Sequence, residues 1–183
     1  MEIGVWIKMN MKTIDNKVFP CFFTLGNLLF GFLAIVLVFH NEVGIAAGMV
    51  LLSVLMDTLD GKVARKLKAN SDFGKELDSL SDMVSFGLAP AVLIYVVIFN
   101  EYCVFWGVWI SALFAICGAI RLARFNVLNI SDHFVGVPIT FAGGFMALLL
   151  LFSNLIPWQL FPTCMILLSI LMISSFEVPK LGK

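Results

Sequence analysis

Long apolar runs, separated by short polar segments, follow one another along the whole chain of 183 residues. Each run is close to the roughly 20 apolar residues that an α-helix needs to cross the hydrocarbon core of a bilayer. The pattern predicts an all-α fold in which residues 1–183 form a single domain, a polytopic bundle of six transmembrane helices. The predicted spans are residues 19–39, 43–59, 83–99, 102–120, 135–154 and 158–176.

Several polar residues predict how the helices begin and end outside the membrane. Residues 1–17 are mixed and polar, and are expected to form a short cytoplasmic N-terminal segment. The second helix is expected to continue past the membrane to about Lys68 and to break near Asn70. Ser71 or Asp72 is then the predicted N-cap of the next helix.

Small residues and a proline mark two of the predicted spans. Gly44 and Gly48 form a small-xxx-small face in the second span, which allows close contact between helices. Contact within the chain is favoured over contact between chains. Pro90 lies inside the third span and is expected to kink it and to free a backbone carbonyl.

Composition and charge support a membrane protein and orient it. The chain is 61% hydrophobic and 13% charged, and its mean hydropathy is +1.01, more apolar than a soluble domain of this size requires. The 12 Lys and Arg residues lie before the first span, between the second and third, after the fourth, and at the C-terminus. The alternate loops contain none. The positive-inside rule therefore predicts a cell-membrane protein with both termini in the cytoplasm.

Four aspartates lie near the segment between the second and third spans. Asp57 and Asp60 are three positions apart and Asp78 and Asp82 four apart, so each pair lies on one face of its helix. Carboxylates beside a membrane segment are costly, and structure alone rarely requires four together. Solvated acids paired with neighbouring Lys or Arg would explain one such pair more readily than two. The two helices are predicted to converge on a divalent metal site.

The ligand types in this segment favour particular ions and a particular chemistry. Carboxylate oxygens select Mg²⁺ or Mn²⁺ over Zn²⁺, and the chain has only two histidines, His40 and His133, in predicted loops. Gly61 and Gly74 lie beside the acids although glycine costs helix stability, which suggests that a nucleotide or phosphate packs against the backbone there. Metal-assisted phosphoryl transfer fits such a site.

The acids, glycines, Ala64 and Arg65 between Asp57 and Asp82 are spaced in a pattern that resembles the signature of the CDP-alcohol phosphotransferase family. Residues 77–90, 121–126 and 136–138 are similar to the phosphatidylserine synthase branch of that family, as are Thr24 and Asn27 in the first span. The similarity covers most of the chain and thins over the last span. The family signature reads Asp57-x2-Asp60-Gly61-x2-Ala64-Arg65-x8-Gly74-x3-Asp78-x3-Asp82 in this chain.

The resemblance implies an integral membrane enzyme, commonly a homodimer, with its site at the cytoplasmic interface. Such an enzyme transfers a phosphatidyl or archaetidyl group from a CDP-linked lipid to the hydroxyl of L-serine and releases CMP. With two Mg²⁺ or Mn²⁺ ions expected, Asp57, Asp60 and Asp78 would be metal ligands. Asp82 would be a shared ligand and the general base of a direct displacement. The residues that would line the CDP site are Gly61, Ala64, Arg65 and Gly74.

Two arginines after the fourth span are candidates for binding the acceptor. Arg121 and Arg124 are three positions apart, and arginine favours bidentate contacts to carboxylates and phosphates. One or both are predicted to hold the serine carboxylate or a substrate phosphate, although either can simply anchor the topology. Asn126 adjoins them. Weaker candidates are Thr24, Asn27 and Ser85, because polar residues in membrane helices often only bond a neighbouring helix.

Two other functions remain open from the sequence. The first is a sister enzyme of the same family that uses another alcohol. The second is a divalent-cation transporter, although Glu42 and Glu101 lie in predicted loops and the aspartates cluster at one end rather than at mid-membrane depth. The expected partners are a CDP-lipid, L-serine and membrane lipid, with no nucleic acid. The lipid tails need only an apolar groove, so the sequence does not distinguish ester-linked from ether-linked lipids.

Overall fold

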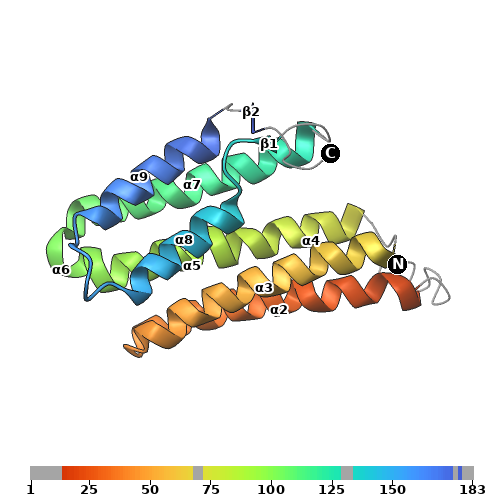
Figure 1. Ribbon diagram of the computed structural model, residues 1–183, viewed down its shortest axis with the longest axis horizontal. Helices are drawn as coiled ribbons and strands as arrows, with labels where there is room; N and C mark the ends of the chain where they lie inside the picture. Colours follow the sequence, from red (N-terminus) through yellow and green to blue (C-terminus); the bar gives the residue numbers. More distant parts are fainter. Residues whose placement is uncertain (1–13, 68–71, 129–133, 175–176, 179–183) are drawn as a thin grey trace, which may run out of the picture.

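The computed structural model describes residues 14–67, 72–128, 134–174 and 177–178, and these residues form a helical bundle (Figure 1). The predicted all-α fold is confirmed, with one pair of two-residue strands added. The elements are α2 (Ile14–Phe39), α3 (Val43–Leu67), α4 (Asp72–Asp82), η2 (Met83–Leu88), α5 (Ala89–Ile94), η3 (Tyr95–Phe99), α6 (Asn100–Tyr102), α7 (Val104–Leu128), β1 (Phe134–Val135), α8 (Ile139–Leu151), α9 (Leu160–Ile173) and β2 (Glu177–Val178).

Four helical runs in the described part of the chain are long and apolar enough to cross a membrane: 21–39, 43–63, 72–102 and 104–127. Large apolar side chains point outward from them, as a lipid environment requires. On α2, for example, Phe22 is 74% exposed and Phe32 is 56% exposed. Contiguous exposed apolar surface of this kind marks a membrane-facing protein.

The last two predicted spans are shorter than expected. Helices α8 and α9 have 13 and 14 residues, which is about 20 Å of helix against roughly 30 Å of hydrocarbon. The predicted span 135–154 begins too early. Gly136 has a φ of +75° and Pro138 is the extended N-cap of α8, so the helix starts only at Ile139. The count of six crossings stays a prediction.

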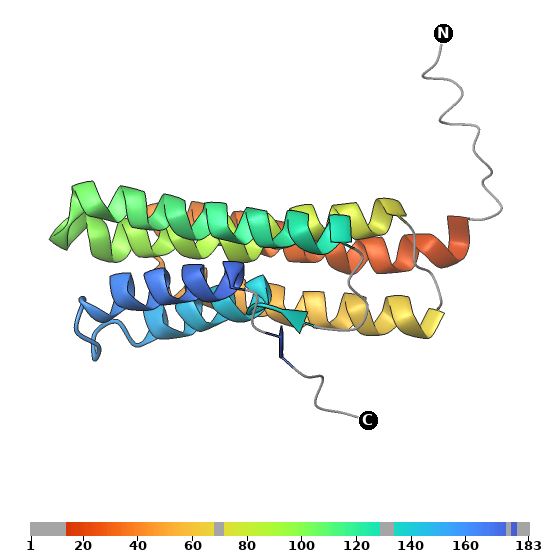
Figure 2. The same ribbon diagram turned by 90° about the horizontal axis from the view of Figure 1, so that it is seen from above.

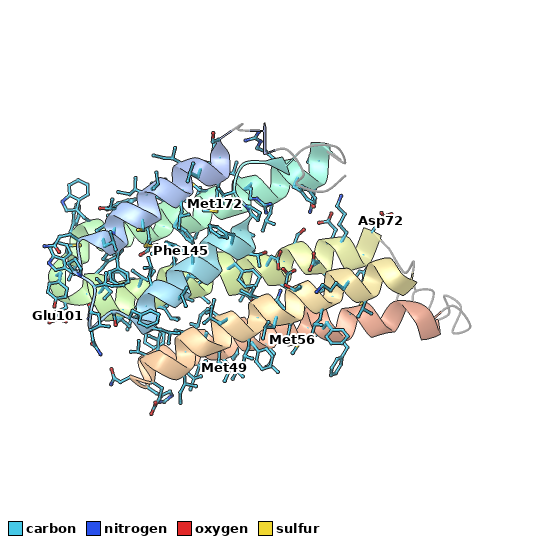
Figure 3. The ribbon with its side chains drawn as sticks, in the orientation of Figure 1. Met49, Met56, Asp72, Glu101, Phe145 and Met172 are labelled. Carbon is cyan, nitrogen blue, oxygen red and sulfur yellow. The ribbon has the colours of Figure 1, made fainter. Side chains whose placement is uncertain are left out.

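The extension of the second span is confirmed, because α3 continues to Leu67. The next helix begins at Asp72, while the break expected near Asn70 falls in residues 68–71, outside the described part of the chain. From Asp72 the chain is helical for 31 residues to Tyr102, so the predicted span 83–99 is only the later part of a longer run. Asp72 and Glu101 lie at opposite ends of the molecule (Figure 3).

Two π-helical segments, η2 and η3, interrupt this long run. Pro90 is the second residue of α5, two positions after the end of η2. Proline has no N–H and its ring crowds the preceding turn, so the backbone before it widens from α to π geometry. The kink expected at Pro90 thus takes the form of a π segment, and this segment follows Asp82 immediately.

The helices form two layers. Helices α2, α7 and the run from α4 to α6 lie in one layer, and α3, α8 and α9 lie in the other (Figure 2). The favoured contact of Gly44 and Gly48 within the chain is wrong, because a Cβ built at either would meet no described atom within 4 Å. Ala46 and Ala47, on another face of α3, are fully buried.

Close packing fixes η2 between α2 and α8. A Cβ added to Gly31 of α2 would lie 2.7 Å from the Cα of Ser85, and one added to Gly143 of α8 would lie 2.5 Å from the carbonyl oxygen of Phe86. Only hydrogen atoms fit at these two glycines. Because Asp82 comes one residue before η2, the same contacts hold its backbone in place.

Candidate active site

Three carboxylates from two helices converge in the structure. Asp57 of α3 meets Asp78 and Asp82 of α4, with one oxygen of each within 4.8 Å of the others. Asp78 and Asp82 are four positions apart, so both project from the same face of α4. We call these three residues the carboxylate triad. Asp57 and Asp78 are partly exposed, and Asp82 is buried.

The fourth predicted ligand, Asp60, lies outside the triad. Its Oδ2 accepts a hydrogen bond from the hydroxyl of Thr24 on α2. It is nevertheless close enough to interact electrostatically with Asp57 and Asp78. Asp60 is 7% exposed, and the structure therefore places it at the edge of the same acidic site.

Helix α2 holds one carboxylate from each acidic pair. Thr24 and Asn27 are three positions apart on one face of α2, where Thr24 contacts Asp60 and Asn27 Nδ2 donates to Asp82 Oδ1 at 3.0 Å. The hydroxyls of Ser53 and Ser85 both donate to the backbone carbonyl of Asn27. Ser85, a weaker candidate for the substrate pocket, thus braces α2 against η2.

The triad fits a divalent cation. Two oxygens on opposite sides of Mg²⁺ are about 4 Å apart, so oxygens within 4.8 Å of one another need little adjustment to bind one ion. Two charges 4.8 Å apart repel each other by roughly 3 kcal/mol at an effective dielectric constant of 20. A hard cation would relieve this repulsion, and all three donors are the oxygens that Mg²⁺ and Mn²⁺ prefer.

Thr140 belongs to the site although the sequence did not reveal it. Its hydroxyl donates to Asp57 Oδ2 at 3.4 Å. Thr140 is the second residue of α8, so the first turn of that helix, with its partial positive charge, lies near Asp57. A threonine two positions after Pro138, near the start of a span, is the only signal that the sequence carried.

The two arginines of α7 lie in different surroundings. Arg121 is partly buried and interacts electrostatically with Asp82. Arg124 Nη1 donates to the carbonyl of Ile173 at 2.7 Å, which satisfies a free carbonyl at the end of α9. The structure thus brings Arg121 to the carboxylate triad and gives Arg124 a contact that supports the fold.

Asn126 also contacts another part of the bundle. Its Nδ2 donates to Ser79 Oγ at 3.0 Å and lies 3.4 Å from Glu76 Oε2, so it links α7 to α4. Ser79 lies one position from Asp78 and therefore on a different side of α4. This link ties the position of α7, and hence of Arg121, to the helix that carries two of the acids.

The four residues expected to line a CDP site lie beyond the acids along α3 and α4. Gly61, Ala64 and Arg65 belong to the last turns of α3, and Gly74 to the first turn of α4. A Cβ built at Gly61 would meet no described atom within 4 Å, so this side of α3 leaves room for a ligand. Their role in binding CDP stays a prediction.

Residues 17–175 match the CDP-alcohol phosphatidyltransferase family, which is nearly the whole chain. The chain belongs to this family. The resemblance seen in the signature from Asp57 to Asp82 is confirmed, and the carboxylate triad consists of signature residues. With its four long apolar helices, this member of the family is an integral membrane protein.

Curated relatives point to one branch of the family. The chain is 45% identical to a CDP-diacylglycerol–serine O-phosphatidyltransferase of Methanocaldococcus jannaschii, over 86% of this chain and 71% of the relative. It is 39% identical to the protein of the same name from Bacillus subtilis, over 90% and 91%. It is 38% identical to an archaetidylserine synthase of Methanothermobacter thermautotrophicus, over 94% and 74%.

Proposed function

We propose that this protein transfers the phosphatidyl or archaetidyl group of a CDP-linked lipid to the hydroxyl of L-serine and releases CMP. The observation that carries the proposal is the convergence of Asp57, Asp78 and Asp82 between two long apolar helical runs of a membrane bundle. Family membership supports the CDP-linked donor. Relatives named as serine transferases, at 39–45% identity over most of the chain, support serine as the acceptor.

The proposal gives the acids the roles that the family resemblance implies, and their surroundings support these roles. Asp57, Asp78 and Asp82 would hold Mg²⁺ or Mn²⁺, with Asp60 completing a site for a second ion. Bound ions supply charge neutralisation at the pyrophosphate and orient it for in-line displacement. Asp82 is the general base of the proposal because it is buried and is held in one position by Asn27.

The proposed reaction is a single displacement. Asp82 accepts the proton of the serine hydroxyl while the serine oxygen attacks the phosphorus that carries the lipid alcohol. The bond between this phosphorus and the bridging oxygen breaks, and CMP leaves with that oxygen. The lipid phosphate is then esterified to serine. The displacement is direct, so it forms no covalent intermediate with the enzyme.

The proposed topology has six crossings with both termini in the cytoplasm, as the distribution of Lys and Arg predicts. Asp57 is ten residues before the end of α3, about 15 Å along the helix. The triad is therefore expected within reach of the cytoplasmic interface, where CDP and serine are present. The family resemblance adds a homodimer to the proposal.

The decisive experiment is CMP release by the purified protein in nanodiscs with Mn²⁺ or Mg²⁺, with and without L-serine. CDP-diacylglycerol and its ether-linked analogue are supplied in parallel. We expect serine-dependent release with at least one lipid and its loss in Asp82→Asn. Glu101→Gln is the matched control, because Glu101 is an exposed acid at the end of the molecule opposite Asp72, 19 residues after Asp82 in the same helical run (Figure 3).

The other outcomes separate the alternatives. Release that depends on a different alcohol, such as glycerol phosphate or inositol, would keep the family and overturn the acceptor. No release with any alcohol and either lipid would overturn the transferase proposal. Mn²⁺ uptake into sealed liposomes would then test the divalent-cation transporter.

A further inference from the structure

Three buried side-chain atoms in the described part of the chain have no hydrogen-bond partner: Asn27 Oδ1, Arg121 Nε and Ser111 Oγ. Two of the three belong to residues that interact with the same carboxylate. Asn27 Nδ2 donates to Asp82 Oδ1, and Arg121 interacts electrostatically with Asp82. A buried polar atom without a partner destabilises a protein, and a ligand that pairs with it removes the cost.

When Asp82 is ionised, as its proposed role as ligand and base requires, the amide of Asn27 has one favourable orientation. An ionised carboxylate accepts hydrogen bonds and donates none, so Asp82 pairs with the Nδ2 side and Oδ1 is left without a partner. The side chain is 0% exposed. Ser53 and Ser85 fix the backbone carbonyl of Asn27 from two other helical segments. Asn27 Oδ1 is therefore a rigidly placed acceptor beside Asp82.

Arg121 supplies the complementary donor from α7. Its Nε is buried and unpaired, and its positive charge favours an anionic group near Asp82. The link between Asn126 and Ser79 holds α7 against α4, so this donor is also fixed relative to the triad. The two unpaired atoms, one acceptor and one donor on a cation, belong to residues of α2 and α7 that both interact with Asp82.

We propose that these two atoms recognise the α-amino acid group of the acceptor. Asn27 Oδ1 accepts a hydrogen bond from the ammonium of serine, and Arg121 Nε donates one to the carboxylate. The serine hydroxyl then faces Asp82. The inference rests on the proposed function, since it assigns the acceptor subsite of that reaction. An alcohol that lacks either charged group leaves one of the two atoms unpaired, and the site selects against it.

The test combines acceptors that lack one charged group with variants that lack one of the two unpaired side-chain atoms. Serine, ethanolamine (no carboxylate) and 3-hydroxypropionate (no ammonium) are compared by kcat/KM for CMP release. We expect Arg121→Gln to shrink the preference for serine over ethanolamine by roughly 10- to 100-fold, the effect of losing a charge-assisted hydrogen bond. Its preference for serine over 3-hydroxypropionate should hold. Asn27→Ala should instead shrink the preference for serine over 3-hydroxypropionate and keep the preference for serine over ethanolamine.

A specificity control, a folding control and a charge-conserving variant complete the test. Ser111→Ala removes the third unpaired atom, which is ten residues from Arg121 on α7 or about 15 Å along the helix, and should leave both preferences unchanged. The rise in unfolding temperature on adding Mn²⁺ should persist in Arg121→Gln and Asn27→Ala. Arg121→Lys keeps the charge without the Nε donor and tests whether charge alone suffices.

The outcomes distinguish this inference from the proposed function. A wild-type protein that shows no serine-dependent CMP release refutes the proposed function itself. A wild-type protein active with serine, whose variants lose activity equally with all three acceptors, refutes only the acceptor subsite. In that case Asn27 merely positions Asp82. An Asn27→Ala variant that needs more Mn²⁺ but keeps both preferences assigns Oδ1 to the metal and likewise overturns the inference.

Discussion

Replacing Gly31 with alanine should impair both folding and catalysis, because no side-chain atom fits at this contact. The added Cβ would lie 2.7 Å from the Cα of Ser85, whereas carbon atoms pack at about 3.5 Å. Helix α2 and η2 would have to separate by roughly 0.8 Å, the difference between these distances. Overpacking of this kind costs about 1–3 kcal/mol.

The separation should reach the carboxylate triad through α2. Asn27, which hydrogen-bonds Asp82, lies four residues before Gly31 on the same helix, and Ser85 bonds the carbonyl of Asn27. A displacement of about 1 Å near reacting groups can cost on the order of 100-fold in rate. We therefore expect a large fall in kcat together with a lower unfolding temperature.

Gly26→Ala on the same helix is the matched control. A Cβ there would lie 3.8 Å from Met56 Sδ, an ordinary contact, and alanine in place of glycine favours the helix by about 0.5–1 kcal/mol. The assay is serine-dependent CMP release in nanodiscs, with thermal unfolding of both variants in the same lipid. If Gly31→Ala were as stable and as active as Gly26→Ala, the close packing of α2 on η2 would not govern the site.

Three further predictions concern the metal and its surroundings. Chelation of divalent cations should abolish CMP release and lower the unfolding temperature, since an ion at 100 times its Kd contributes about 2.7 kcal/mol; an unfolding temperature insensitive to Mn²⁺ would contradict a metal site. Thr24→Val removes the hydroxyl that donates to Asp60 and should weaken metal affinity by about 10- to 100-fold in a Mn²⁺ titration, whereas Thr24→Ser should bind normally. Arg124→Gln should lose the contact to the Ile173 carbonyl, destabilise the protein by about 1 kcal/mol or less, and leave the KM for serine unchanged; a raised KM would place Arg124 in the acceptor site.

Much of the site could be predicted because its residues are close in sequence and follow helical periodicity. The spacings within the acidic pairs place each pair on one helix face, and the signature from Asp57 to Asp82 indicated the family. Sequence spacing does not give the rotation of one helix against another. Only the structure shows that Asp57 joins Asp78 and Asp82 while Asp60 turns toward Thr24.

The same limit explains the residues that sequence reasoning misjudged. Arg121 and Arg124 have the same residue type and are separated by less than one turn, yet α7 packs so that one interacts with Asp82 and the other bonds Ile173. Gly44 and Gly48 had the spacing of a contact face, but α3 is rotated so that no described atom meets them. Which face turns inward depends on the packing of the whole bundle.

The sequence by itself determined the membrane character, the helical class, the acidic pairs and the family, because hydrophobic length and residue spacing are properties of a single helix. The tertiary structure alone decided how far each helix extends, where the π segment η2 directly follows Asp82, and which distant residues meet the acids. Thr140 reaches Asp57 across 83 positions, and Asn27 reaches Asp82 across 55. Contacts over such separations depend on how the helices pack, which no local pattern encodes.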